Sequence, residues 1–541
     1  MPDPAKLPYE IFAMILNLAF EDSKRDSVQH LYALSLFNRR WNKALLPRMY
    51  SEWTYNGARQ SFMTLWKFFI TIRRDPYLAG LVRTLTIGNW GFYRPRNPEQ
   101  FQSQFSQLSL PPDELALLRT AIHDAGIGRR EDRILRSLSE RDRRPVVALL
   151  LVSLPNLQSV SAYYPRRDPF MKAVLENAVG WENGASYSPG LLCLKELHLF
   201  NEVPAIWPGN RQSLKDLGGD FTDSDTGSNE DTDTGNIDDP YDSDENDNLD
   251  VDYLCPIFHL PSIRTLSLPN LDYTGAATGI IGNINAMHQL EGLSITSSAP
   301  IGEEWLYLDL WVLITQPRAL KYLEFHLTNT DFIGGVINPN LWNSLQKQKA
   351  SLENLDLCIV QHSDEDGFID RVPPLNRLSE LTSLKHLSVH AETLLGRFEN
   401  DSVATFRLRD TLPTSLISLT FYQEDAYGYS EDLPEQLMEV ILSGDFPLLR
   451  TIVLQEMLGS DYESDYLEPN YKAVENVCLE RGIDFQMKAD DQVPRHGICG
   501  DIFDKTEYLK KDGCLRTLAL DRGQIEYFKD LQELTLRDNR L

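Results

Sequence analysis

Two histidines in the second half of the chain have the residue type of a metal site but not its spacing. His386 and His390 stand four residues apart, with Glu392 nearby, in a segment whose pattern predicts a strand. Four residues of strand span roughly 13 Å, whereas zinc ligands lie about 2 Å from their ion. We therefore expect these imidazoles to be polar residues of a sheet surface and not ligands of one ion.

The signatures of common catalytic sites are absent from the sequence. It contains no Gly-x-Ser-x-Gly, no His-Glu-x-x-His, no P-loop and no Gly-x-Gly-x-x-Gly after a strand. The six cysteines are widely spaced and form no Cys-x-x-Cys pair, which argues against a zinc knuckle and favours free thiols in a reducing compartment. We expect a non-enzymatic chain with no catalytic residues, no metal ligands and no cofactor.

Polar strand positions between residues 322 and 422 form the better candidate site. Aromatic, acidic and imidazole groups alternate there with apolar residues, so they would share the face of a sheet that does not meet the core. Tyr and His combine contact area with a polar tip, which suits protein binding; the alternative is that these residues are merely exposed. The predicted substrate-binding residues are Tyr322, Glu324, His326, Asn354, Asp356, His386, His390 and Tyr422.

An apolar triplet must position these groups. The pattern Leu-x-x-Leu-x-Leu, with other aliphatic residues or Phe allowed, advances from Ile263 by 27, 30, 32, 32, 32 and 33 residues, near the roughly 20–29-residue period of leucine-rich repeats. One unit cannot cover its own apolar side, so we expect a stack with a parallel sheet on its concave face and helices on its convex face. The copies are Val82-Leu85-Ile87, Leu157-Val160-Ala162, Leu194-Leu197-Leu199, Ile263-Leu266-Leu268, Leu290-Leu293-Ile295, Leu320-Leu323-Phe325, Leu352-Leu355-Leu357, Leu384-Leu387-Val389, Leu416-Leu419-Phe421, Leu449-Ile452-Leu454, Leu515-Leu518-Leu520 and Leu531-Leu534-Leu536.

The first 53 residues have a different pattern. Apolar residues at helical spacing predict three short helices between residues 7 and 53, and Pro47 is expected to end the last of them. So small a unit buries too little apolar surface to be stable alone. We expect its remaining apolar face to pack against another body.

The same segment resembles an F-box. Leu7-Pro8-Tyr9-Glu10-Ile11, Ile15, the stretch from Leu34 to Trp41, and Leu45-Leu46-Pro47 are similar to the motif in filamentous-fungal F-box proteins with C-terminal leucine-rich repeats. The resemblance implies that residues 1–60 dock on the Skp-type adaptor, and through it the cullin, of an SCF (cullin–RING) ubiquitin ligase. Residues 61–541 would then select a protein substrate for ubiquitination and proteasomal degradation. By position, the adaptor-binding residues would be Leu7, Pro8, Ile11, Ile15, Leu34 and Trp41.

Other interpretations of the same segments remain open. The N-terminal module is also compatible with an amphipathic helical cap, and the repeats with a protein-interaction scaffold that has no link to a ligase. A helical insert is expected at 88–150, with helices at 114–122 and 132–138, and a disordered acidic loop at 218–252.

Charge and hydropathy limit the partners. The net charge of −27 disfavours nucleic acid as a ligand, because phosphate binding needs a basic surface. No apolar run reaches the roughly 18 residues that span a membrane. We expect a soluble protein of the cytoplasm, the nucleus or both.

Overall fold

The architecture is that of a computed structural model. It describes residues 35–36, 39–56, 60–89, 110–139, 142–164, 168–179, 191–201, 256–268, 287–297, 310–327, 337–359, 377–395, 404–422, 432–456 and 468–489. Within these ranges, no helix combines the length and the apolar character needed to cross a lipid bilayer. The two C-terminal triplets, the acidic loop at 218–252 and residues 7 to 34 lie outside them.

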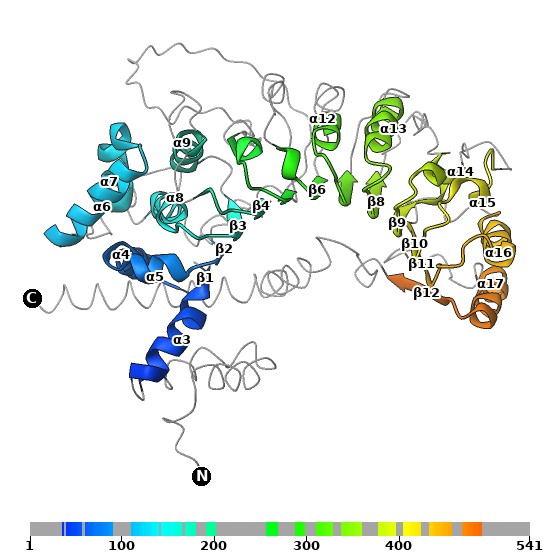
Figure 1. Ribbon diagram of the computed structural model, residues 1–541, viewed down its shortest axis with the longest axis horizontal. Coiled ribbons are helices and arrows are strands. Elements are labelled where there is room, and N and C mark those ends of the chain that lie inside the picture. The colour runs from blue at the N-terminus through cyan, green and yellow to red at the C-terminus, as the bar shows by residue number, and fades with distance from the viewer. Residues whose placement is uncertain are drawn as a thin grey trace, which may run out of the picture.

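One parallel sheet organises the described chain (Figure 1). Its twelve strands follow one another in sequence order, so each strand from β2 to β11 pairs with the one before it and the one after it. The strands are β1 (Glu52–Asn56), β2 (Thr84–Asn89), β3 (Ser159–Tyr164), β4 (Glu196–Asn201), β5 (Thr265–Leu268), β6 (Gly292–Ser297), β7 (Tyr322–Leu327), β8 (Asn354–Ile359), β9 (His386–His390), β10 (Ser418–Tyr422), β11 (Thr451–Glu456) and β12 (Asp484–Ala489).

Helices connect successive strands and line the outer side of the arc that the strands trace (Figure 1). This is the α/β arrangement expected from the repeats, with the sheet on the inner side. The α-helices are α3 (Arg39–Ser51), α4 (Phe62–Arg74), α5 (Pro76–Leu81), α6 (Pro112–Asp124), α7 (Glu131–Ser139), α8 (Arg144–Ser153), α9 (Pro169–Ala178), α12 (Leu310–Thr315), α13 (Ile337–Lys347), α14 (Ala391–Leu395), α15 (Leu408–Thr411), α16 (Leu433–Ser443) and α17 (Glu468–Arg481), and the short 3-10 helices are η3 (Gly128–Arg130), η7 (Met287–Gln289) and η8 (Leu378–Glu380).

The apolar triplets form the core that faces these helices. Each copy from Val82 to Leu454 falls on one of the strands β2 to β11, and the strand predicted there is confirmed. The middle residues align across the sheet, for example Leu266 with Leu293 and Leu293 with Leu323, and all three are at most 1% exposed. Side chains two apart on a strand share a face, so the two inward positions of every triplet stack on those of its neighbours.

A repeated backbone contact fixes the entry to each strand. The Lys321 carbonyl accepts hydrogen bonds from the N–H groups of both Glu353 and Asn354, at 2.8 and 2.9 Å. The Glu353 carbonyl accepts in the same way from Lys385 and His386, at 2.8 and 3.0 Å. Because this arrangement recurs from strand to strand, units with different loops start their strands in the same register.

The sheet also includes two strands that the triplet did not predict. β1 pairs with β2, and β12 pairs with β11. The residues that face the core are Trp53 and Tyr55 in β1, and Phe485 and Met487 in β12. Aromatic residues or methionine replace the aliphatic ones, so a template built on Leu missed them. Among the described residues the sheet therefore begins at Glu52, inside the segment 1–60 that was expected to be a helical module.

Pro47 does not end its helix, and that prediction is wrong. α3 runs from Arg39 to Ser51 with Pro47 inside it. A proline removes one N–H from the helix and usually breaks it. Contacts beyond the proline hold the last turn in place: Tyr50 packs against the core, and the Ser51 carbonyl accepts a bond from the Arg83 N–H at 2.8 Å.

The region 88–150 contains helices where they were expected. α6 covers the predicted segment 114–122 and α7 the predicted segment 132–138. α6 packs against α4, and the indole of Trp66 donates a hydrogen bond to Glu114 at 2.7 Å. This part of the chain thus adds a helical layer outside β2 and β3.

Candidate functional site

The predicted substrate-binding residues lie on four adjacent strands, β7 to β10, on the face opposite the leucine core. Alternation along each strand produces this placement, since the core takes Leu323, Phe325 and their equivalents. Strand pairing sets them in rows across the sheet: Tyr322, Asn354, His386 and Ser418; Glu324, Asp356, Ser388 and Thr420; His326 beside Cys358; and His390 beside Tyr422.

Most of these residues are not open to solvent. Glu324, Asn354, Asp356, His390 and Tyr422 have relative exposures between 2 and 7%, so an exposed wall is the wrong description for them. Tyr322, His326 and His386 are half-buried. One physical reason is that neighbouring strands lie only about 4.8 Å apart, so large side chains on one face cover each other.

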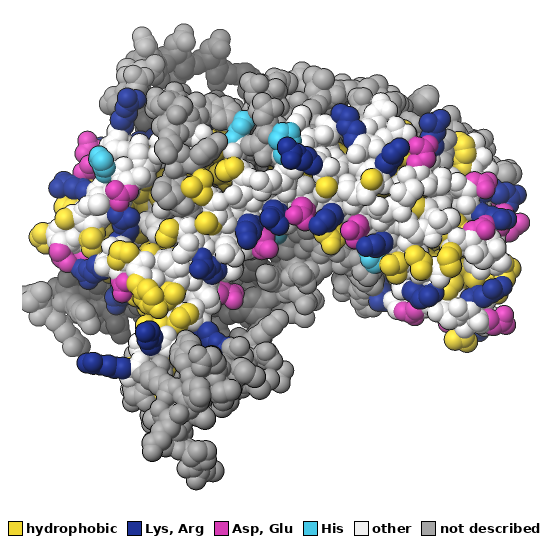
Figure 2. Space-filling model, in the orientation of Figure 1, with side chains coloured by type: hydrophobic (Ala, Val, Ile, Leu, Met, Phe, Trp, Pro, Cys, Tyr) yellow, Lys and Arg dark blue, Asp and Glu magenta, His cyan; other side chains and the backbone are white. Residues whose placement is uncertain are grey.

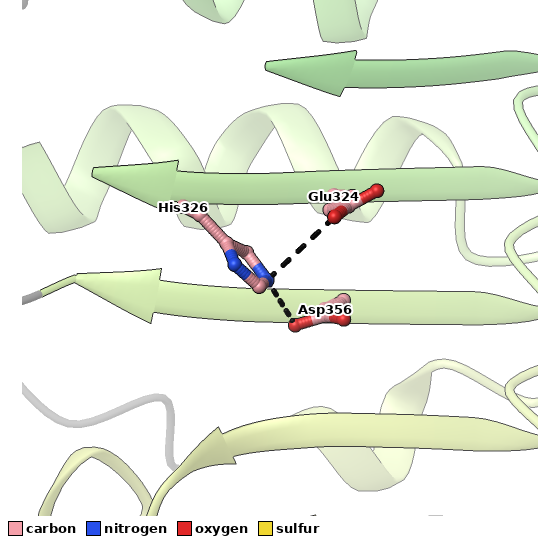
Figure 3. Close-up of side chains that lie close together, drawn as sticks. All are labelled: Glu324, His326 and Asp356. Carbon is pink, nitrogen blue, oxygen red and sulfur yellow. Dashed lines mark hydrogen bonds and ion pairs between the residues drawn. The ribbon is translucent and has the colours of Figure 1, made fainter. Parts of the chain in front are cut away.

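Asp356 is the centre of a polar network. Its Oδ1 accepts a hydrogen bond from the Tyr422 hydroxyl at 2.6 Å and lies 2.8 Å from His326 Nε2. His326 Nε2 also lies 3.8 Å from Glu324 Oε1, on the same strand (Figure 3). Two carboxylates and an imidazole, from two strands, thus converge on one point of the sheet face.

The Tyr422 ring links this network to a second imidazole. Its centroid lies 5.7 Å from the His326 ring and 5.7 Å from the His390 ring. The pKa of His390 is lowered to about 4, mainly by burial and also by the neighbouring His326, while the backbone of Tyr422 and the charge of Asp356 oppose the shift. His390 is therefore neutral at physiological pH.

Cys358 belongs to the same cluster, and the prediction from sequence missed it. Its Sγ lies 3.6 Å from His390 Nε2. Cys358 follows Asn354 and Asp356 at the same two-residue interval, so strict alternation along the strand was the signal that could have found it. A thiol beside an imidazole can form a nucleophile–base pair. A base whose pKa is near 4 is poorly matched to that task at neutral pH, because general bases work best with pKa values near the ambient pH.

His386 stands apart from the cluster. Its Nδ1 lies 2.7 Å from Ser418 Oγ on β10, in the row of the sheet that also holds Tyr322 and Asn354. The two histidines of β9 thus have separate partners, as the strand spacing predicts.

The starts of the strands form an exposed edge of alternating charge. Figure 2 shows Lys or Arg and acidic side chains following one another in a band across the middle of the molecule. At the starts of β5 to β9, Glu291 pairs with Arg264 at 3.4 Å and with Lys321 at 2.7 Å, and Lys385 pairs with Glu353 at 2.6 Å. Solvent screens exposed ion pairs of this kind, so these side chains can exchange partners with a bound protein at little cost.

Of the predicted adaptor-binding residues, the structure describes only Trp41. It lies on α3 and is half-buried, while Leu36, just before that helix, is 67% exposed. Leu7, Pro8, Ile11, Ile15 and Leu34 lie outside the described residues.

Comparison with family models and with curated proteins finds no relative. No family model matches the sequence, and no curated protein was found that resembles it. A function for this chain is therefore inferred from its own residues. These are the polar network on β7 to β10, the charged edge at the strand starts, and residues 7 to 50, whose sequence resembles an F-box.

Proposed function

We propose that this chain is the substrate-recognition subunit of an SCF-type (cullin–RING) ubiquitin ligase, in which residues 7 to 50 bind a Skp-type adaptor and the sheet binds a protein substrate. The observation that carries the proposal is the continuous twelve-stranded parallel sheet. It brings polar residues from separate repeats onto one inner face, and in the sequence it follows a segment that resembles an F-box.

The sheet is suited to hold a protein partner rigidly. Each strand from β2 to β11 is hydrogen-bonded on both sides within the stack, and the face residues are linked across strands, as Tyr422 is to Asp356. A surface that is ordered before binding loses little conformational entropy when a partner docks. The parts of the surface open to a partner are the half-buried Tyr322 and His386, together with the charged edge.

In this function the chain provides proximity. A receptor that holds a substrate beside the transfer machinery raises the effective concentration of the reacting lysine, and its partners perform the chemistry. The second candidate is a leucine-rich-repeat scaffold without a ligase, and adaptor binding separates the two.

The test is a pulldown of purified Skp-type adaptor with the full-length chain. A fragment that ends at residue 60 is unsuitable, because it would keep β1 without its partner β2. We expect the wild type to retain the adaptor and the double variant Leu7→Ala with Pro8→Ala to retain at least about tenfold less. Leu479→Ala is the matched control, since Leu479 is 78% exposed on α17, at the other end of the sheet.

Failure of the wild type to bind the adaptor would leave the scaffold as the function. Equal binding by wild type and double variant would remove the F-box assignment from residues 7 and 8.

A further inference from the structure

Glu324, His326 and Asp356 present three potential metal-donor atoms at one point. One ligand atom from each residue lies within 4.8 Å of the other two. The separation is 2.8 Å between His326 Nε2 and Asp356 Oδ1, and 3.8 Å between His326 Nε2 and Glu324 Oε1 (Figure 3). Donors about 2.0–2.1 Å from a tetrahedral ion lie about 3.3–3.4 Å from one another. The two measured separations fall on either side of that value, so small side-chain shifts would accommodate an ion.

The scaffold that holds these donors is rigid. Glu324 and His326 are two residues apart on β7 and so share a face, and Asp356 on β8 is the register partner of Glu324. Their side chains are only 5 to 12% exposed. Water therefore competes weakly with the donors, and an ion between them would be held by strands whose backbone is fixed on both sides.

The surroundings are those of a coordinating carboxylate. Tyr422 donates a hydrogen bond to Asp356 Oδ1 at 2.6 Å, and carboxylates that bind metals are commonly oriented by such outer hydrogen bonds. Asp356 Oδ1 can keep this hydrogen bond when it binds a metal ion, because a carboxylate oxygen has two lone pairs.

An independent feature of the same cluster also indicates a ligand. His390 is 3% exposed, and its Nδ1 has no hydrogen-bond partner among the residues that the structure describes. Its ring lies against Tyr422, beside the carboxylate that Tyr422 orients. A buried polar atom without a partner costs free energy, and a neutral imidazole is the form in which histidine binds metals. The His390 Nδ1 atom is therefore a second position in this cluster whose hydrogen-bonding capacity a bound ligand or water would satisfy.

The donor set selects the kind of ion. Calcium and magnesium prefer a shell of oxygen atoms alone. A site that combines imidazole with carboxylates, beside a thiol, suits zinc and neighbouring first-row transition metals. We propose that Glu324, His326 and Asp356 form a binding site for one such divalent ion, with zinc as the representative. The site goes beyond the receptor function, since it would tie two repeats together whatever the chain binds.

Zinc titration of the full-length protein, after treatment with a chelator, tests the proposal. We expect calorimetry to show one zinc ion bound to the wild type, and Asp356→Asn and His326→Gln each to weaken that binding at least about tenfold. His386→Gln is the matched control, because it removes an imidazole of the same sheet face that lies outside the cluster. Calcium, added in place of zinc, should not bind at the site.

A second measurement distinguishes lost binding from lost folding. Zinc should raise the Tm of the wild type and of His386→Gln but not that of His326→Gln, and far-UV circular dichroism shows whether each variant is folded. Cobalt(II) bound to the wild type should show the visible absorption of a four-coordinate ion with a nitrogen ligand, and His326→Gln should lose it. Zinc bound equally by wild type and folded variants, or not bound by the wild type, would overturn the proposal.

Discussion

The Tyr422 hydroxyl donates a hydrogen bond to Asp356 Oδ1 over 2.6 Å, although the two residues are 66 apart in the sequence and their strands are not neighbours. The strand between them is β9, where Ser388 stands in register with Asp356. A serine is small enough to leave room for the tyrosine side chain to reach across it. The contacts within the polar cluster thus depend on the size of the residue that each repeat has at the same position of its strand.

Loss of that hydroxyl should destabilise the protein. Tyr422→Phe keeps the ring but removes the donor from a buried carboxylate, and we expect the free energy of unfolding to fall by about 1–3 kcal/mol. Urea denaturation followed by circular dichroism measures it. Tyr322→Phe, on the half-buried start of β7, is the control and should change stability by less than about 0.5 kcal/mol. Equal effects of the two substitutions would contradict the role assigned to the bond.

A buried glutamine on the helical side of the sheet should stabilise the fold at least as much as the Tyr422 hydroxyl does. Gln348 is 1% exposed, donates hydrogen bonds to the carbonyls of Ile314 and Pro317 at 2.9 and 2.8 Å, and accepts one from the Leu320 N–H at 3.0 Å. Gln348→Leu leaves three backbone groups without this partner, so we expect a loss of about 2–4 kcal/mol in the free energy of unfolding.

The control for that substitution lies two residues earlier. Gln346 bonds Glu380 at the surface, at 3.1 Å, and Gln346→Leu should cost less than about 0.5 kcal/mol. Urea denaturation of both variants decides the point. A mild effect at Gln348 would show that water can replace its amide.

The stability of the helical region should depend on pH through Asp168. This residue is 2% exposed and caps α9 by accepting from the Phe170 and Met171 N–H groups at 2.9 and 3.0 Å. Burial raises the pKa of Asp168 from 3.8 to about 6, with Arg144 opposing the shift. The folded protein therefore holds the proton more tightly than the unfolded chain. The stabilising contribution of this group is complete below about pH 3.8 and is lost as the pH rises through 6.

Asp168→Asn keeps an acceptor for the helix and removes the charge. Its stability relative to the wild type should rise by about 1–1.5 kcal/mol between pH 5 and pH 7.5. Urea denaturation at the two pH values measures that difference. Asp75→Asn, at the half-exposed cap of α5, reports what the same substitution does without deep burial. A difference that stays constant with pH would refute the assignment.

Substrate capture should depend on the half-buried residues of the inner face. We expect Tyr322→Ala with His386→Ala to reduce the proteins recovered by affinity purification with the proteasome blocked, while adaptor binding is unchanged. Asp356 is a poor choice for this experiment, because its buried hydrogen bonds stabilise the fold. Lys347→Ala, on the exposed surface of α13, serves as the control. Full recovery by the double variant would place the substrate on another surface.

Much of the fold could be predicted because its signal is local and repeated. Each triplet such as Leu320-Leu323-Phe325 predicts which residues of a strand face the core. The pattern recurs often enough to predict a stack of repeats. The terminal strands escaped prediction because Trp53 and Tyr55 in β1, and Met487 in β12, take core positions where the pattern requires an aliphatic residue or Phe. Pro47 was misjudged for a related reason, since packing of Tyr50 outweighs the local preference of a proline.

The sequence by itself determined the alternation of apolar and polar residues, and with it the face on which His326, Asp356 and Tyr422 lie. Only the tertiary structure decided that these three side chains meet and that five of the predicted face residues are buried. The physical reason is that distances along a strand are set by covalent geometry, whereas distances across a sheet depend on how neighbouring repeats align. His386 and His390 could therefore be judged too far apart from their numbers alone, but the contact of His326 with Asp356, 30 residues away, required the pairing of β7 with β8.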